Sequence, residues 1–151
     1  MEQDQLPAEP LIPHRLRMRL IDSVKGPTQN GLQAETIVTE EWPLHNNGEV
    51  SSIICIELVA QAISALSTWR RGQGARPRVG LLVGIKEAEF SKSGVPVGTR
   101  LHIEIKELSH VGAYAVFEGK VRSNVETFCK ITIQVMEPEE TLSNLKSRQR
   151  I

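Results

Sequence analysis

The segment from Ser52 to Leu66 constrains the fold of this chain more than any other. If the segment is a helix, none of its sides is clearly polar, because its apolar residues lie at positions 53, 54, 56, 58, 59, 60, 62, 63, 65 and 66. A helix with this pattern belongs inside a core. Glu57 lies in the middle of it, although a carboxylate is rarely buried unless it is paired or protonated. Two interpretations are open: a carboxyl with a raised pKa suited to proton transfer, or a structural group that bonds backbone or a dimer contact.

Composition limits the chain to one ordinary domain. It has 151 residues, enough for one core, and its Lys+Arg and Asp+Glu counts balance at 18 each, so neither nucleic acid nor a membrane is an expected partner. It lacks a signal-peptide pattern and any apolar run of bilayer length, which predicts a cytoplasmic protein. Cys55 and Cys129 are predicted to be free buried thiols. No metal-ligand spacing or nucleotide-binding glycine loop occurs, and no metal or cofactor is expected.

The remaining pattern predicts a sheet that covers the helix. Alternating charged and apolar residues predict a strand over 15–22 and, after a turn, a second over 32–40. Ser51 or Ser52 is the expected N-cap of the helix, which should end near Arg70. Four more strands are predicted at 78–90, 100–108, 113–122 and 128–136.

Two strands, one buried helix and four antiparallel strands make an α+β layout, an antiparallel sheet wrapped round one long central helix. We expect residues 1–10 to be a flexible N-terminus, 11–137 a single domain and 138–151 a polar C-terminal tail. An apolar helix with its own sheet on one side needs cover on the other side as well. A dimer is therefore expected.

Four segments in this order resemble the beta-hydroxyacyl-acyl-carrier-protein dehydratases, which have the hot-dog fold. They are Leu-Ile-Pro-His-Arg at 11–15 with the residues after it, Ile-Glu-Leu-Val-Ala-Gln-Ala at 56–62, and the segments 82–90 and 95–101. The similarity spans roughly residues 11–136. The stretch Pro-Leu-His-Asn-Asn-Gly-Glu-Val at 43–50 is most similar to the dehydratase-like branch of aryl-polyene clusters. The resemblance implies an α+β hot-dog fold and a lyase of fatty acid or polyketide biosynthesis, which dehydrates a 3-hydroxyacyl thioester to a trans-2-enoyl thioester.

In that family a histidine takes the alpha proton and an acidic residue helps to expel the hydroxyl as water. The resemblance assigns the acid to Glu57, and it assigns the amide that binds the thioester oxygen to Ser52 or Ile53 at the helix start. Gln61 lies one turn from Glu57 on the same face. Gln61 is a candidate substrate-binding residue beside Ser52 and Ile53. The alternative is a buried amide that bonds backbone, and orienting Glu57 is compatible with both.

The catalytic histidine maps less directly. An ungapped alignment puts Trp42 where the family has its histidine, and His45 is the loop histidine ahead of the helix. The leading hypothesis is that His45 of one subunit serves Glu57 of the other. The alternatives are an ordinary exposed His45 in a thioesterase or a non-catalytic acyl-binding subunit, or a second hot-dog chain that supplies the missing group. His14 is interpreted as fixing the start of the first strand, with catalysis a minor alternative.

The expected substrate is a thioester of acyl carrier protein or coenzyme A. The expected assembly is a homodimer, with a higher oligomer or a heterodimer with another hot-dog chain as alternatives. A basic stretch follows the helix and consists of Arg70, Arg71, Arg76 and Arg78. It is interpreted as a solvated helix end that can also meet a pantetheine phosphate or an acidic carrier.

Overall fold

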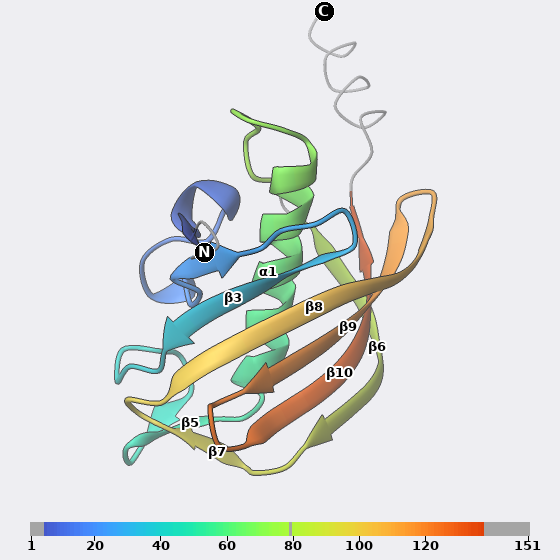
Figure 1. The fold of residues 1–151 in the computed structure, drawn as a ribbon. Helices are drawn as coiled ribbons and strands as arrows, with labels where there is room; N and C mark the ends of the chain where they lie inside the picture. The colour runs from blue at the N-terminus through green and yellow to red at the C-terminus, as the bar shows by residue number, and fades with distance from the viewer. Residues whose placement is uncertain (1–4, 79, 138–151) are drawn as a thin grey trace, which may run out of the picture.

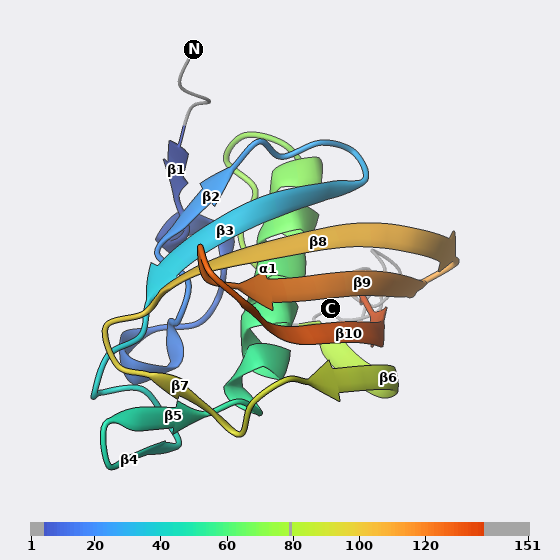
Figure 2. The same ribbon diagram turned by 60° about the horizontal axis from the view of Figure 1, so that its bottom comes forward.

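The computed structural model describes residues 5–78 and 80–137, in which a strongly curved sheet wraps one long helix (Figure 1). The helix is α1 (Ile54–Arg70). The large sheet is antiparallel throughout and has the order β1 (Gln5–Pro7), β2 (Ser23–Lys25), β3 (Gly31–Ile37), β8 (Arg100–Val111), β9 (Tyr114–Arg122), β10 (Thr127–Met136) and β6 (Leu81–Phe90). A small sheet lies by the start of α1 (Figure 2), and it has the order β4 (His45–Asn46), β5 (Glu49–Ser51) and β7 (Gly94–Pro96). Two short 3-10 helices precede β2, at Glu9–Leu11 and Leu16–Met18.

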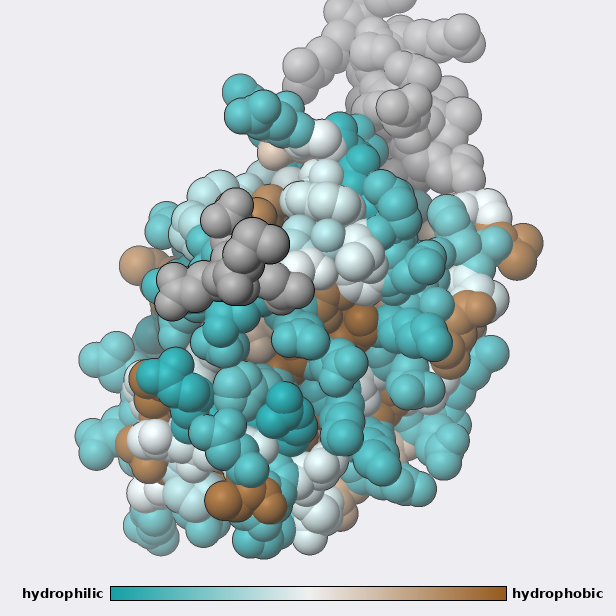
Figure 3. All heavy atoms as spheres, in the orientation of Figure 1, coloured by the Kyte–Doolittle hydropathy of each residue, from teal (hydrophilic) through white to brown (hydrophobic). Residues whose placement is uncertain are grey.

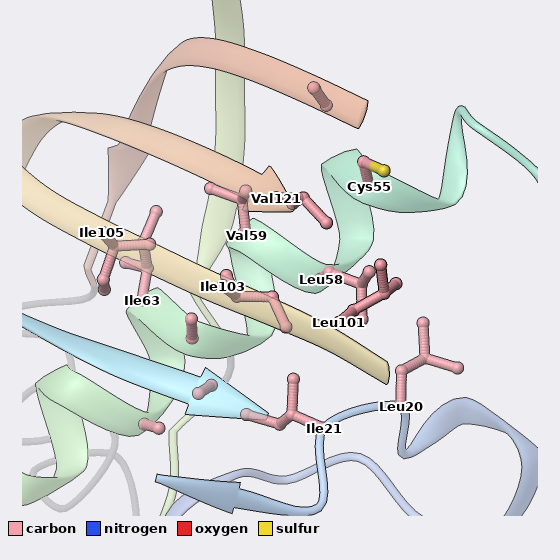
Figure 4. Close-up of a cluster of buried hydrophobic side chains, with 14 of the residues drawn as sticks. Leu20, Ile21, Cys55, Leu58, Val59, Ile63, Leu101, Ile103, Ile105 and Val121 are labelled. Carbon is pink, nitrogen blue, oxygen red and sulfur yellow. The ribbon is translucent and has the colours of Figure 1, made fainter. Parts of the chain in front are cut away.

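The helix is covered as its sequence predicts. No residue of α1 is exposed, and Leu58, Val59 and Leu66 are completely buried. Leu58 and Val59 lie against the inner side chains of β8 and β9, among them Ile103 and Val121 (Figure 4). Since burying each large aliphatic side chain stabilises the fold by about 1.5–3 kcal/mol, this layer holds the sheet on the helix.

The two faces of the sheet differ as the alternation predicts. On β8, Leu101, Ile103 and Ile105 are buried, whereas Glu104 and Lys106 between and after them are exposed. The outer face is mostly hydrophilic in Figure 3. The predicted α+β arrangement is thus confirmed, and every strand of the large sheet that was expected after the helix is present.

The two ends of the helix differ in how well they were predicted. The serine N-cap is wrong, because the cap position is Ile53 and no side chain caps the helix. Ser52 turns its hydroxyl into the interior, where it has no hydrogen-bond partner among the described residues. The other end agrees with the prediction: α1 stops at Arg70, and Gly72 follows with φ +102°, a conformation that suits glycine.

The predicted strand over 15–22 is wrong. Residues 16–18 form a 3-10 helix, and the first strand after it is β2, which starts at Ser23. The cause is a side chain distant in sequence: Gln61 accepts hydrogen bonds from the N–H groups of Leu20 and Ile21, which are therefore not free to join a ladder.

The beginning of the chain is more ordered than the sequence suggested. Gln5–Pro7 form β1, paired with β2, and Ala8 and Ile12 are completely buried. The loop predicted at 42–50 contains the short strands β4 and β5. Residues 1–4 and the predicted tail at 138–151 lie outside the described residues.

Candidate active site

The chain brings His14 and Glu57 together. Nε2 of His14 lies 3.2 Å from Oε1 of Glu57, and the two side chains are 26% and 36% exposed. Glu57 lies in the first turn of α1, while His14 comes from the irregular segment between the two 3-10 helices. In Figure 1 this N-terminal segment lies beside α1, on the side opposite β6. An imidazole and a carboxyl in contact are a pair that can exchange a proton.

Local bonds hold the His14 segment in place. The guanidinium of Arg15 donates to the carbonyl of Ile12 at 2.6 Å and to that of His14 at 2.8 Å. Ile12 anchors the segment in the core, since it is completely buried. The second ring nitrogen of His14, Nδ1, is buried and has no hydrogen-bond partner among the described residues.

Gln61 ties this segment to Glu57. Its amide nitrogen donates to Oε1 of Glu57 at 3.1 Å and to the carbonyl of Met18 at 2.6 Å. Its oxygen accepts from Leu20 at 2.9 Å and from Ile21 at 3.3 Å. The interpretation of Gln61 as a buried amide that bonds backbone and orients Glu57 agrees with these contacts. Because both His14 and Gln61 contact Oε1, Oε2 of Glu57 is the oxygen left for a ligand.

The expected raised pKa of Glu57 is not what this environment produces. Burial has the largest single effect and raises the pKa of Glu57. The hydrogen bonds from His14 and Gln61, with the charge of His14, together lower it by more. The pKa of Glu57 therefore lies below its ordinary value, and the carboxyl is ionised at neutral pH in the unliganded chain.

The pair lines a cavity of about 400 Å³. One wall is the half-buried stripe of α1 formed by residues 56, 57, 60, 64 and 67, and the others come from Pro13 and His14, from the start of β6 and from the end of β10. The surface of the cavity is mainly apolar, with aliphatic side chains that include Ile63, Leu82 and Val135. A mainly apolar cavity with an imidazole and a carboxyl in its wall suits a ligand with an acyl chain.

The other predicted site residues lie apart from this pair. His45 is on β4, outside the cavity lining, and its Nε2 is buried without a partner among the described residues. The Ser52 N–H already donates to the carbonyl of Ser93 at 2.9 Å, so it is not a free amide. The Ile53 N–H has a long 3.4 Å contact with Oγ of Ser51. One chain contains no contact between His45 and Glu57; the hypothesis of a pair across two subunits stays a prediction.

The remaining reactive side chains do not extend the site. Cys55 and Cys129 are free and buried, and their mutual hydrogen bond together with burial raises the pKa of Cys55, so it is no thiolate nucleophile. His102 lies on the outer face, paired with Glu35. Within residues 5–78 and 80–137 no cluster of three metal-binding side chains occurs. Nor is any helix there long and apolar enough to cross a membrane.

Comparison with known proteins decides the family. The profile of the ApeP-like dehydratases, described as ApeP dehydratase, matches residues 6–146. The chain belongs to the ApeP-like dehydratase family. This match covers nearly all of the chain and includes both His14 and Glu57. No curated protein sequence matches the chain.

Solved structures agree with the fold of an ApeP-like protein. The dehydratase heterocomplex ApeI:P from Xenorhabdus doucetiae is 24% identical with a TM-score of 0.80, covering 93% of this chain and 97% of that chain. A hypothetical thioesterase with coenzyme A from Streptococcus pneumoniae is 16% identical with a TM-score of 0.59, over 75% and 82% of the two chains. The PaaI protein of E. coli, from the phenylacetic acid degradation operon, is 11% identical with a TM-score of 0.58, over 76% and 81%. The predicted hot-dog fold and its dehydratase branch are confirmed.

Sequence reasoning gave His14 too little weight. The Pro13-His14-Arg15 segment was part of the resemblance, but His14 was interpreted as fixing the start of the strand predicted directly after it. The signal that was missed is Gln61, whose buried amide needs backbone partners and finds them in the segment after His14.

Proposed function

We propose that this chain dehydrates a 3-hydroxyacyl thioester to a trans-2-enoyl thioester, with His14 and Glu57 as the reacting pair. The observation that carries the proposal is the 3.2 Å contact between His14 and Glu57 in the wall of a mainly apolar cavity. Membership of the ApeP-like dehydratase family supports the reaction class. An imidazole and a carboxyl supply the base and the acid that the elimination of water needs.

The reaction needs a proton on Glu57, whose carboxyl is ionised in the unliganded chain because its pKa is lowered. An acyl chain that fills the cavity removes water from around the carboxylate and so favours its protonated form. His14 then takes the proton from C2, the C2–C3 double bond forms, and the C3–O bond breaks. Glu57 donates its proton to the departing hydroxyl, which leaves as water.

The thioester oxygen gains negative charge during this step and needs a hydrogen-bond donor. The Ile53 N–H is the better of the two predicted amides, because its 3.4 Å contact is weak whereas the Ser52 N–H is firmly bonded. It lies at the start of α1, where the helix dipole also favours negative charge.

The substrate carrier and the assembly form part of the proposal. The expected carrier is an acyl carrier protein or coenzyme A, and the expected assembly is a homodimer or a heterodimer with another hot-dog chain. The relative named as the ApeI:P heterocomplex supports the second possibility. In a heterodimer the partner chain would need no reacting pair of its own for this chain to act.

The test is a 3-hydroxyacyl thioester assay that records both enoyl formation and free thiol. The wild type should form the enoyl product. His14→Ala and Glu57→Gln should each lower kcat by at least about 100-fold, since general acid–base catalysis contributes roughly that much. His110→Ala, which removes an exposed histidine on β8, should keep wild-type activity. Release of thiol without an enoyl product would favour a thioesterase, and neither product a binding subunit.

Mixed dimers distinguish His14 from His45. When His14 and Glu57 act within one chain, a dimer of His14→Ala with Glu57→Gln has no complete pair and should stay inactive. When His45 of one subunit serves Glu57 of the other, mixing His45→Ala with Glu57→Gln should restore one site per dimer. Native mass spectrometry confirms the mixed dimers. If His45→Ala alone is inactive and gains activity when mixed with Glu57→Gln, while His14→Ala is fully active, the assignment to His14 is overturned.

A further inference from the structure

Two arginines line the end of the cavity far from Glu57. Arg71 is the C-cap residue of α1, and Arg78 lies in the segment that leads to β6. Burial and the positive charge of Arg78 lower the pKa of Arg71, against the opposing effect of Glu137. Both arginines line the same cavity, together with Glu137, whose carboxylate forms no ion pair with either of them. Two like charges in one wall make the binding of an anion favourable there.

The donors of these two arginines are largely unused. Arg71 donates to the carbonyl of Arg76 at 2.8 Å and has a long 3.5 Å contact with Oγ1 of Thr68. Neither Arg71 nor Arg78 forms an ion pair with any carboxylate of the described residues. Arg70 contrasts with them, since it is bonded to Glu107 at 2.7 Å. Each guanidinium has five N–H donors, so most of those on Arg71 and Arg78 are available to a ligand.

The distance between the two ends of the cavity limits what ligand can span it. Arg71 follows Glu57 by 71 − 57 = 14 residues, and a rise of 1.5 Å per residue separates their Cα atoms by about 21 Å. The same cavity extends along Ala60, Ser64 and Ser67 between them. The hydroxyls of Ser64 and Ser67 have no hydrogen bond among the described residues, and they are polar groups along an otherwise aliphatic wall.

We infer that Arg71 and Arg78 bind the phosphate of a phosphopantetheine arm whose thioester reaches His14 and Glu57. This inference rests on the proposed function. About thirteen covalent bonds join the sulfur and the phosphorus of this arm. An extended polypeptide backbone with the same number of bonds spans about 15 Å, and the extended arm has about the same length. The side chains of Glu57 and Arg71 span the remaining length. Two amides lie along the arm, and Ser64 and Ser67 are placed to bond them.

The exposure of the residues gives the direction of entry. Arg71 and Arg78 are exposed, whereas His14 and Glu57 are only half-exposed. A phosphate is costly to remove from water, so it stays at the open end while the thioester goes inward. Planar guanidinium groups bind phosphate with two parallel hydrogen bonds, which makes a pair of arginines a fitting site for it. A carrier attached to this phosphate would then dock beside the C-terminal end of α1.

Binding of unreactive ligands tests the inference without relying on dehydration. Saturated acyl thioesters of pantetheine and of 4′-phosphopantetheine lack the 3-hydroxyl and differ from each other only by the phosphate. In calorimetric titrations, the wild type should bind the phosphorylated ligand at least about tenfold more tightly. The ratio of the two dissociation constants should fall towards one in the double variant Arg71→Gln,Arg78→Gln. It should persist in Arg76→Gln, which removes a neighbouring exposed charge outside the cavity lining.

The possible outcomes separate this inference from the proposed function. A wild-type ratio of one, or a ratio that the double substitution leaves unchanged, would overturn the phosphate site even if dehydration occurs. A ratio that the double substitution removes would support the site even in a chain that forms no enoyl product. A third ligand, an acyl-pantetheine with a terminal carboxylate on the acyl chain, tests the opposite orientation. Its selective binding through the two arginines would contradict the inference.

Discussion

At the scale of single residues, Glu57 is held by its neighbours more than by its burial. Because the folded pKa of Glu57 lies below its unfolded value, its contribution to stability is present above the unfolded pKa and is lost as the pH falls through the folded pKa. Glu57→Gln should therefore abolish activity but lower the free energy of unfolding at pH 7 by no more than about 1 kcal/mol, because the side chain is 36% exposed. In this variant the free energy of unfolding should also decrease less than in the wild type as the pH falls from 7 to 4. Urea unfolding at pH 7 and pH 4 checks both effects; full activity with a large loss of stability would contradict the catalytic role.

The sequence indicated that Glu57 is unusual but did not indicate its partner. The unusual setting of Glu57 was visible from its apolar neighbours, since an acid in a buried helix is rare. Its partner was not, because His14 is 43 positions away (57 − 14 = 43) and reaches the helix only through contacts with no local pattern. The hydrogen bonds of Gln61 to residues 18, 20 and 21 are of the same kind. Periodicity reports which face of an element is buried and carries no information about such pairs.

At the scale of elements, α1 and the sheet approach each other closely at Gly119 of β9. A Cβ on Gly119 would lie 2.6 Å from both methyl carbons of Val59 on the helix. Gly119→Ala should therefore lower the free energy of unfolding by about 1–3 kcal/mol, the usual cost of overpacking a core. Gly84→Ala is the matched control, because a Cβ on this glycine of β6 meets nothing within 4 Å. Equal midpoints of urea unfolding for the two variants would show that the helix and sheet tolerate a wider separation.

Most elements were predictable because their periodicity agrees with their burial. The inner residues of β8, β9 and β10 alternate with outer ones along much of each strand, and these strands fall within a few residues of the predicted ranges. The strand predicted over 15–22 failed although its sequence alternates. The N–H groups of Leu20 and Ile21 both donate to the side-chain oxygen of Gln61, which holds the segment in a loop.

At the scale of the whole molecule, the sheet has two unequal edges. One is β1, only three residues long, and the other is β6, with ten residues that are all exposed except Gly84. Apolar side chains are abundant on β6, where Leu81, Val83 and Ile85 are 51%, 50% and 46% exposed. A long exposed apolar edge is a site for pairing with another strand, whereas a short one is not. A second hot-dog chain, identical or different, is therefore expected to pair along β6.

This pairing predicts a dimer that substitutions on β6 dissociate. Light scattering at micromolar concentration should give twice the chain mass of 16.8 kDa for the wild type. Val83→Lys,Ile85→Lys should give a monomer, because charges on an edge strand oppose pairing. Val111→Lys is the control, since Val111 is 77% exposed but lies at the far end of β8. A stable wild-type monomer that also fails to bind a second hot-dog chain would contradict pairing. So would equal dissociation by the control, because the apolar surface at Val111 is separated from β6 by β9 and β10.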